Sequence, residues 1–109
     1  MKRNKNDVIA EIKTALDEAK VKARAYKYLT AKRYDYRRAL AAIAAYDQAL
    51  AIFAQGTEHN ISDLAIAAIA EFEWARDNDT PKMTLAVADG RRDAFASVAD
   101  WMTTEEGNR

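Results

Sequence analysis

Neither glycine nor proline interrupts the stretch from Asp7 to Gln55, DVIAEIKTALDEAKVKARAYKYLTAKRYDYRRALAAIAAYDQALAIFAQ. Ala, Leu, Lys, Arg and Glu dominate it, and these residues are strong helix formers. Asn6 is placed to cap the start of a helix, and Gly56 stands where a left-handed C-terminal cap would end one. The stretch therefore predicts helix throughout, and it makes the chain all-α: a small antiparallel helical bundle.

The apolar residues of this stretch decide whether it forms one helix or two. On a straight helix the apolar stripe turns by roughly 220° between Ile12 and Phe53, whereas a steady heptad repeat drifts by only about 120° over that length. The excess predicts an irregularity between Leu29 and Tyr36, which is either a kink in one long helix, a skipped turn or a helical hairpin. Leu29 and Tyr36 are expected to point toward the core.

Two further helices are indicated by their start signals. Ser62 is a good N-cap for a helix over 63–77. Thr80 and Pro81 together are typical of a helix start, since proline suits the first helical position, and they predict a helix over 81–103.

Two features inside these helices lead to separate expectations. Trp74 and Trp101 recur at helical spacing with the apolar residues, which favours the core for each of them, with exposure of at least one at an interface as the alternative. Asp89 and Gly90 form a dipeptide that is common in turns, so it predicts a kink or a short turn in the last helix, with a hairpin as the alternative.

The length of the chain indicates one domain. Its 109 residues suffice for one modest core, so 1–109 is predicted to be a single helical domain with frayed ends at about 1–6 and 104–109. Half of the residues are apolar and alanine is the commonest, which predicts a thin core of close helix contacts that self-association into a homo-oligomer would extend. The N-terminus MKRNKNDVIAEIKTALDE is charged and lacks an unbroken apolar stretch, so we expect no secretory signal. No run of about 18 apolar residues is present, so we expect no membrane contact and a cytoplasmic location.

The residue types restrict the possible chemistry. There is no cysteine, and His59 is the only histidine, so neither a catalytic triad nor a histidine metal cluster is visible. Three scattered glycines cannot form a phosphate-binding loop, and no two carboxylates form a convincing acid and base pair. We therefore expect no enzyme activity, no catalytic residue, no cofactor and no metal.

Charge is distributed unevenly along a chain whose net charge is zero. Residues 1–46 hold twelve Lys or Arg and five Asp or Glu, a balance of +7, while residues 47–109 hold five and twelve, a balance of −7. This polarity has two explanations, between which the sequence does not decide. Either the halves attract each other, within one chain or between subunits, or the basic half contacts an external partner.

The basic charge is most concentrated in residues 20–38, KVKARAYKYLTAKRYDYRR, which carry eight Lys or Arg against the single acid Asp35. Tyrosines are threaded between the bases. Guanidinium groups bind carboxylates and phosphates, and tyrosine rings anchor protein interfaces or stack on bases. The stretch is therefore either a solvated helix face or a partner-binding surface, with these candidate residues: Arg24, Tyr26, Lys27, Tyr28, Lys32, Arg33, Tyr34, Arg37 and Arg38.

The sequence thus favours a non-catalytic binding protein, whose Tyr, Arg and Lys side chains dock on an acidic surface of a partner protein. Small size and plain composition suit a regulator or inhibitor, including one encoded by a virus or a mobile element. The alternative is a protein that binds nucleic acid or nucleotide phosphates through the same basic patch. The zero net charge and the acidic second half count against that alternative.

Overall fold

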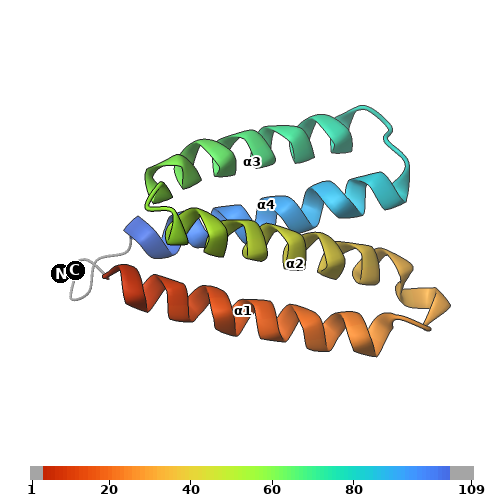
Figure 1. Ribbon diagram of the computed structural model, residues 1–109. Coiled ribbons are helices and arrows are strands. Elements are labelled where there is room, and N and C mark those ends of the chain that lie inside the picture. The colour runs from red at the N-terminus through yellow and green to blue at the C-terminus, as the bar shows by residue number, and fades with distance from the viewer. Residues whose placement is uncertain (1–3, 104–109) are drawn as a thin grey trace.

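The computed structural model describes residues 4–103, which are almost entirely helical (Figure 1). Four α-helices follow one another along the chain: α1 (Lys5–Tyr26), α2 (Arg33–Ala54), α3 (Ile61–Asp77) and α4 (Lys82–Thr103). No β-strand occurs within residues 4–103, and successive helices run in opposite directions. The prediction of a small all-α antiparallel bundle is confirmed.

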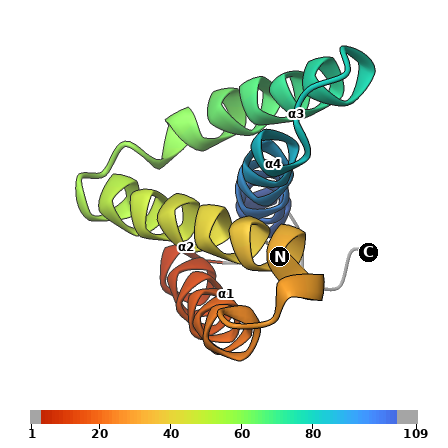
Figure 2. The ribbon, with the colours of Figure 1, turned by 90° about the vertical axis from the view of Figure 1, so that its right-hand side faces the viewer.

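The second and fourth helices form the centre of the bundle. α2 packs along α4, α1 packs mainly on α2, and α3 packs on α4 (Figure 2). α3 diverges from α2 with distance from the connection between them, so α4 alone supports most of α3. Each of the two outer helices, α1 and α3, consequently keeps a wide face turned toward solvent.

The predicted irregularity between Leu29 and Tyr36 belongs to a helical hairpin. α1 ends at Tyr26, and a short 3₁₀ turn, η1 (Thr30–Lys32), leads directly into α2. The backbone N–H of Leu29 donates to the Tyr26 carbonyl at 3.0 Å, and the N–H of Lys32 donates to the Leu29 carbonyl at 2.9 Å. One long kinked helix is therefore excluded. The reversal brings the apolar stripes of both helices to one core, which a continuous helix could not do.

Helix α2 ends with the glycine cap that the sequence predicts. Gly56 has a φ of 75°, in the left-handed region that glycine occupies without steric cost. Its N–H donates to the Phe53 carbonyl and the N–H of Thr57 donates to the Ile52 carbonyl, each at 3.1 Å. This is the Schellman pattern. A second 3₁₀ turn, η2 (Glu58–Asn60), then leads into α3.

Two helices begin earlier than predicted. The side chain of Asn4 caps α1 by accepting a hydrogen bond from the backbone N–H of Asp7 at 2.9 Å, so Asn6 lies inside the helix. α3 begins at Ile61 and Ser62 lies in its first turn, because η2 already brings the chain into helical geometry. Residues 1–3 and 104–109, where most of the expected fraying falls, lie outside the described residues.

The Asp89 and Gly90 pair does not interrupt α4, so the predicted kink, turn or hairpin is wrong. Gly90 is buried where α4 crosses α2. A Cβ atom at this position would overlap the backbone carbonyl oxygen of Arg38 and lie 2.9 Å from the Cβ of Ala41. The glycine therefore permits the close approach of two helices, and the approach fixes how α2 and α4 face each other.

The core contains many alanines and few large side chains, as the composition predicts. Trp101 is half-buried and stacks on Tyr46, with ring centroids 6.4 Å apart. The largest fully buried side chains are Phe95, Ile12, Ile61, Val8 and Val98.

Among the described residues, no helix combines the length and the apolarity that a membrane span requires.

Two residues expected in the core are exposed instead. Trp74 on α3 is 65% exposed and Leu29 is 50% exposed. Helical spacing places a residue on an apolar face, but it does not say whether another helix covers that face. α3 packs on α4 with its other side, and the turn that holds Leu29 lies at the end of the bundle (Figure 1). Tyr36, in contrast, is partly buried as expected.

Candidate functional site

The structure divides the nine candidate residues of the basic stretch between two places. Tyr34 and Arg38 face α4 and contact its acidic side chains. The others lie on or beside the turn between α1 and α2. Together with Leu29 they form a surface that we call the tip: Arg24, Tyr26, Lys27, Tyr28, Leu29, Lys32, Arg33 and Arg37.

Asp89 is the centre of the contact between α2 and α4. Its carboxylate accepts a hydrogen bond from the Tyr34 hydroxyl at 2.7 Å, and it lies 3.2 Å from Nε of Arg38. Arg92, one turn along α4, donates to the same carboxylate at 2.7 Å. The Asp89 side chain is only 13% exposed, so two hydrogen bonds and the ion pair with Arg38 satisfy a carboxylate that is largely withdrawn from water.

A second carboxylate extends this contact. Asp93, one turn after Asp89, forms an ion pair with Arg38 and lies 3.0 Å from the guanidinium of Arg92. The Arg92 guanidinium also lies 4.0 Å from the ring centroid of Phe72, which connects the network to α3. We call these side chains the inner network: Tyr34, Arg38, Asp89, Arg92 and Asp93. In it, one basic residue of the first half of the chain, Arg38, meets two acidic residues of the second half.

Burial keeps two tyrosines protonated, Tyr34 of the inner network and Tyr46 near it. Loss of solvent raises the pKa of Tyr34 to about 12, and the hydrogen bond to Asp89 acts in the same direction. Burial likewise raises the pKa of Tyr46, against the opposing effects of a hydrogen bond with Ser97 and the charge of Arg38. Both hydroxyl groups are therefore protonated at neutral pH, and that of Tyr34 donates a hydrogen bond to Asp89.

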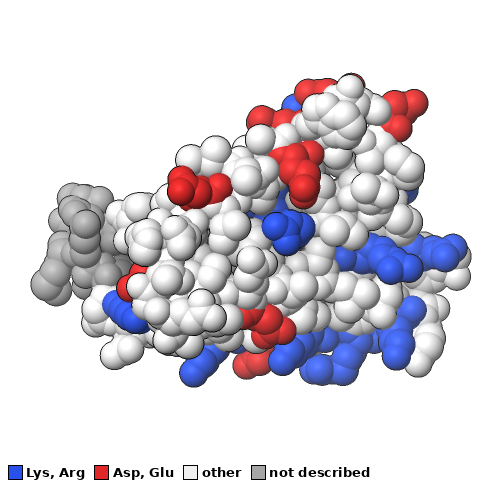
Figure 3. Space-filling view, turned by 45° about the horizontal axis from the view of Figure 1, so that its top comes forward, with Lys and Arg blue, Asp and Glu red and all other residues white. Residues whose placement is uncertain are grey.

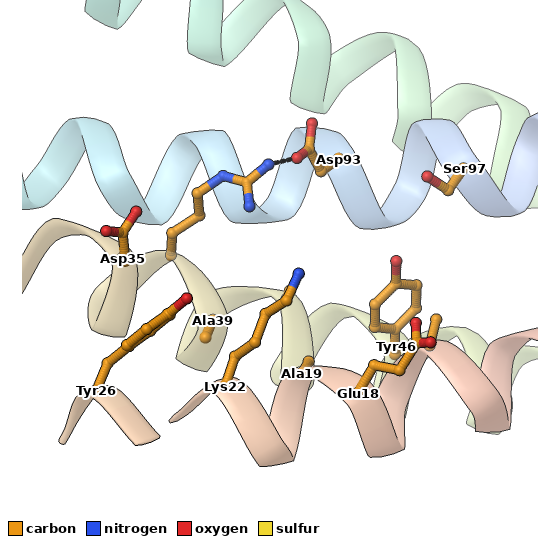
Figure 4. Close-up of a pocket in the computed structure, with 12 residues that line it drawn as sticks. Glu18, Ala19, Lys22, Tyr26, Asp35, Ala39, Tyr46, Asp93 and Ser97 are labelled. Atoms are coloured by element: carbon orange, nitrogen blue, oxygen red, sulfur yellow. Dashed lines mark ion pairs between the residues drawn. The ribbon is translucent and has the colours of Figure 1, made fainter. Parts of the chain in front are cut away.

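A hollow of about 330 Å³ opens beside the inner network, between α1, α2 and α4 (Figure 4). Figure 4 shows Lys22 and Glu18 extending from α1, and the two residues are one helical turn apart. Across the hollow Arg38 is paired with Asp93, and Asp35 at the rim is paired with Lys32. Arg38, Asp93 and Asp35 are thus paired with opposite charges, and Glu18 and Lys22 carry charges of opposite sign. The lining of the hollow therefore favours neither an anionic nor a cationic ligand. Its floor is formed by Ala15, Ala19, Ala39 and Ala42.

The tip presents apolar and aromatic groups to solvent. Tyr28 is 85% exposed and stands next to the half-exposed Leu29. Lys27 Nζ lies 5.4 Å from the ring centroid of Tyr28, and Lys32 Nζ lies 5.8 Å from that of Tyr26. The backbone hydrogen bonds of the turn fix its shape, so these groups are displayed on an ordered scaffold.

The bases of the tip remain mostly unpaired within the described part of the chain. Lys32 lies 3.8 Å from Asp35, but no carboxylate of residues 4–103 is in ion-pair distance of Lys27, Arg33 or Arg37. Figure 3 shows acidic side chains gathered along the upper edge of the molecule, where α3 lies, and basic side chains at its lower right. The tip is therefore a cationic surface with an apolar centre.

Sequence reasoning missed the role of Asp89, Arg92 and Asp93 in the inner network. The opposite charges of the two halves of the chain were a signal for such a contact, but that signal names no pair of residues. The Asp89 and Gly90 dipeptide was instead interpreted by its frequency in turns.

Within residues 4–103 no group of three or more His, Asp or Glu side chains is placed to hold a metal ion.

Comparison of the chain with protein family models, with curated proteins and with solved structures finds no match. Function is therefore inferred from the residues of this structure.

Proposed function

We propose that this protein is a non-catalytic binding protein that docks its tip on an acidic surface of a partner protein. The observation that carries the proposal is the exposure of Tyr28 and Leu29 in the middle of unpaired bases. Residues of protein interfaces that contribute most to binding are enriched in tyrosine and arginine, and they lie in a centre that becomes desolvated on binding. The tip combines these residue types on an ordered turn.

The shape of the tip also supports a protein partner. The turn lies at one end of the bundle, where it can enter a depression of a partner without a collision by the rest of the molecule (Figure 1). The pair of Tyr28 and Leu29 would fill an apolar pocket, while Arg33 and Arg37 would meet carboxylates at its rim. A role as a small regulator or inhibitor, which acts by covering a surface of its partner, is consistent with this mode of binding.

Nucleic-acid binding through the same bases is the alternative. It would use the charges of the tip but would leave Leu29 without a role, and the acidic side chains along α3 would repel a long polyanion. The protein docking proposal accounts for both the apolar and the charged groups.

Site-specific photo-cross-linking tests the proposal directly. The photoreactive residue benzoylphenylalanine replaces Tyr28 in the full chain, which is produced in its own host. A matched protein carries it at Lys13, an exposed position in the middle of α1. We expect a discrete protein adduct from position 28 that is absent from position 13. The adduct is expected to disappear when Arg33→Glu and Arg37→Glu are added, because the charges would then repel an acidic partner. Equal adducts from both positions, or no adduct from position 28, would contradict the proposal.

A binding titration separates the two candidate partners. Fluorescence anisotropy of labelled single-stranded RNA and duplex DNA is measured with the wild-type protein and with the Arg33→Gln, Arg37→Gln variant. Arg38 is left unchanged because its loss would disturb the inner network. We expect no binding at near-physiological salt, about 0.15 M. Binding that falls steeply with salt and is lost in the variant would instead favour the nucleic-acid alternative.

A further inference from the structure

The outer face of α3 carries a second exposed apolar surface. Ile66, Ala70 and Trp74 are spaced by four residues, so they lie one above the other on the same side of the helix. Ile66 is 66% exposed and Trp74 is almost equally exposed. They lie opposite the side that packs on α4, where Ala65 and Ala68 are buried. No helix of the described chain covers this stripe.

Acidic side chains surround the stripe. α3 contains four carboxylates and one base. Glu71 lies 3.8 Å from Arg91 of α4, and the single base, Arg76, pairs with Asp77 at 3.0 Å. Asp63 and Glu73 are exposed on the stripe side of the helix, and no base of residues 4–103 is in ion-pair distance of them. We call this surface the α3 face: Asp63, Ile66, Ala70, Glu73, Trp74 and Asp77.

We infer that the α3 face binds the tip of a second copy of this chain. This inference rests on the proposed function of the tip and names its partner. The two surfaces are complementary both in their exposed apolar groups and in the sign of their charges. Tyr28 and Leu29 would cover the stripe of Ile66 and Trp74, and the bases of the tip would face the carboxylates that border it.

Other ways of covering the α3 face fit less well. A second α3 face would bring carboxylates against carboxylates, and like charges across an interface are unfavourable. The tip of the same chain cannot reach it, because α2 and α4 lie between the α1–α2 turn and the outer side of α3 (Figure 2). The contact is therefore intermolecular and joins two different surfaces.

A pair that is joined by a single contact between a tip and an α3 face leaves one tip and one α3 face unoccupied. Such head-to-tail contacts continue into a ring if the rotation between copies closes, and into an open chain if it does not. The smallest such ring is a two-fold dimer in which each tip docks on the α3 face of the other copy, and in every case the average mass is expected to increase with protein concentration.

Sedimentation velocity with three proteins tests this arrangement. The tip variant carries Tyr28→Ala and Arg33→Glu, and the face variant carries Trp74→Ala and Glu73→Lys. All four positions are exposed, so folding is preserved, which circular dichroism verifies. We expect wild-type protein to exceed the mass of a monomer as its concentration increases, and each variant to remain monomeric because association weakens by about tenfold or more. An equimolar mixture of the two variants retains one intact tip and one intact α3 face, so it is expected to form a complex of one copy each and nothing larger.

Charge reversals away from both surfaces provide the controls. Lys13→Glu and Asp47→Lys change exposed charges on α1 and α2 and are expected to leave the association unchanged. Higher salt is expected to weaken it, because the opposing charges are exposed and therefore screened.

Two results would overturn the inference: a wild-type protein that stays monomeric at all concentrations, or a mixture of the variants that does not associate. A separate outcome distinguishes this failure from failure of the proposed function. If the wild-type protein is monomeric but position 28 still cross-links to a different protein, the tip docks on another partner and only the self-association is refuted. If the wild-type protein is monomeric and position 28 forms no adduct, then both the self-association and the docking function of the tip are refuted.

Discussion

The inner network and the tip come from the same basic stretch, yet they differ in what their residues contact. Arg38 pairs with two carboxylates of α4, while its neighbour Arg37 is exposed and has no such partner within residues 4–103. The hydroxyl group of Tyr34 donates a hydrogen bond to Asp89, whereas the side chain of Tyr28 lies in solvent. Residue type therefore does not decide whether a side chain has a structural role or a docking role. The deciding factor is whether the side chain faces α4, which supplies the carboxylates of the inner network.

This comparison leads to a division of effects. Substitutions in the inner network should lower stability, because the network joins the two central helices of the bundle. Substitutions at the tip should leave stability nearly unchanged, since surface changes away from special features usually alter it by no more than about 0.5 kcal/mol. The predictions below test this division, beginning with the largest effect.

Gly90→Ala is expected to be the most destabilising change. The new Cβ would overlap the Arg38 carbonyl oxygen, and a backbone atom cannot move aside as a side chain can. The helices must separate, so we expect a loss of about 3 kcal/mol in the free energy of unfolding, at the upper end of typical overpacking costs. Urea denaturation measures it.

Gly56→Ala is the matched control for this change. Nothing lies within 4 Å of a Cβ at Gly56, but its φ of 75° is unfavourable for alanine. We expect a loss of about 1 kcal/mol from this strain alone. If Gly90→Ala costs no more than Gly56→Ala, then α2 and α4 do not approach each other as closely as the structure shows.

Asp89→Ala is expected to have the next largest effect. It removes the acceptor that Tyr34, Arg38 and Arg92 share and leaves their donors to Asp93 or to water. We expect a loss of about 2 kcal/mol, measured by urea denaturation, because groups that lose a buried partner pay their desolvation cost. Asp47→Ala on the exposed side of α2 is the control and should be nearly neutral. Equal effects of the two substitutions would show that the inner network contributes nothing to stability.

The helices themselves were predictable from the sequence because their signals are local. Pro81 precedes a helix that begins at the next residue, and Gly56 ends α2 with the cap that its position predicts. The shift of the apolar stripe also located the break between α1 and α2. It could not distinguish a kink from a hairpin, because that choice depends on which surfaces of the two helices pack together.

The features that sequence reasoning missed depend on contacts between distant residues. Gly90 has the same local signature whether it forms a turn or permits helix crossing, and only the position of α2 decides. Trp74 has core-like spacing but lies on the side of α3 that faces away from α4. The docking residues were predicted as one surface for the same reason, although Tyr34 and Arg38 turned out to belong to the inner network.

Two tyrosine substitutions compare the regions at the level of one hydroxyl group. Tyr34→Phe removes the donor of the 2.7 Å hydrogen bond to Asp89, and we expect a loss of about 1 kcal/mol in the free energy of unfolding. Tyr28→Phe removes a hydroxyl that lies in solvent, so stability should not change. Thermal denaturation of the two variants beside the wild type measures both. A loss of similar size in both variants would mean that the Tyr34 hydroxyl is no better bonded than the exposed one.

The smallest expected effect is a dependence of stability on alkaline pH. Burial and the hydrogen bond to Asp89 raise the pKa of Tyr34 from 10.0 to about 12, so the unfolded chain releases this proton before the folded protein does. The contribution of Tyr34 to stability is thus complete below about pH 10 and is lost as the pH rises from about 10 to about 12. The comparison with Tyr34→Phe isolates the contribution of the Tyr34 hydroxyl, because the two proteins share every other titratable group. We therefore expect the stability advantage of the wild type over Tyr34→Phe, measured by urea denaturation, to shrink between about pH 10 and about pH 12. Tyr28→Phe should follow the wild type at every pH, and an advantage over Tyr34→Phe that does not change with pH would place the Tyr34 hydroxyl in solvent like that of Tyr28.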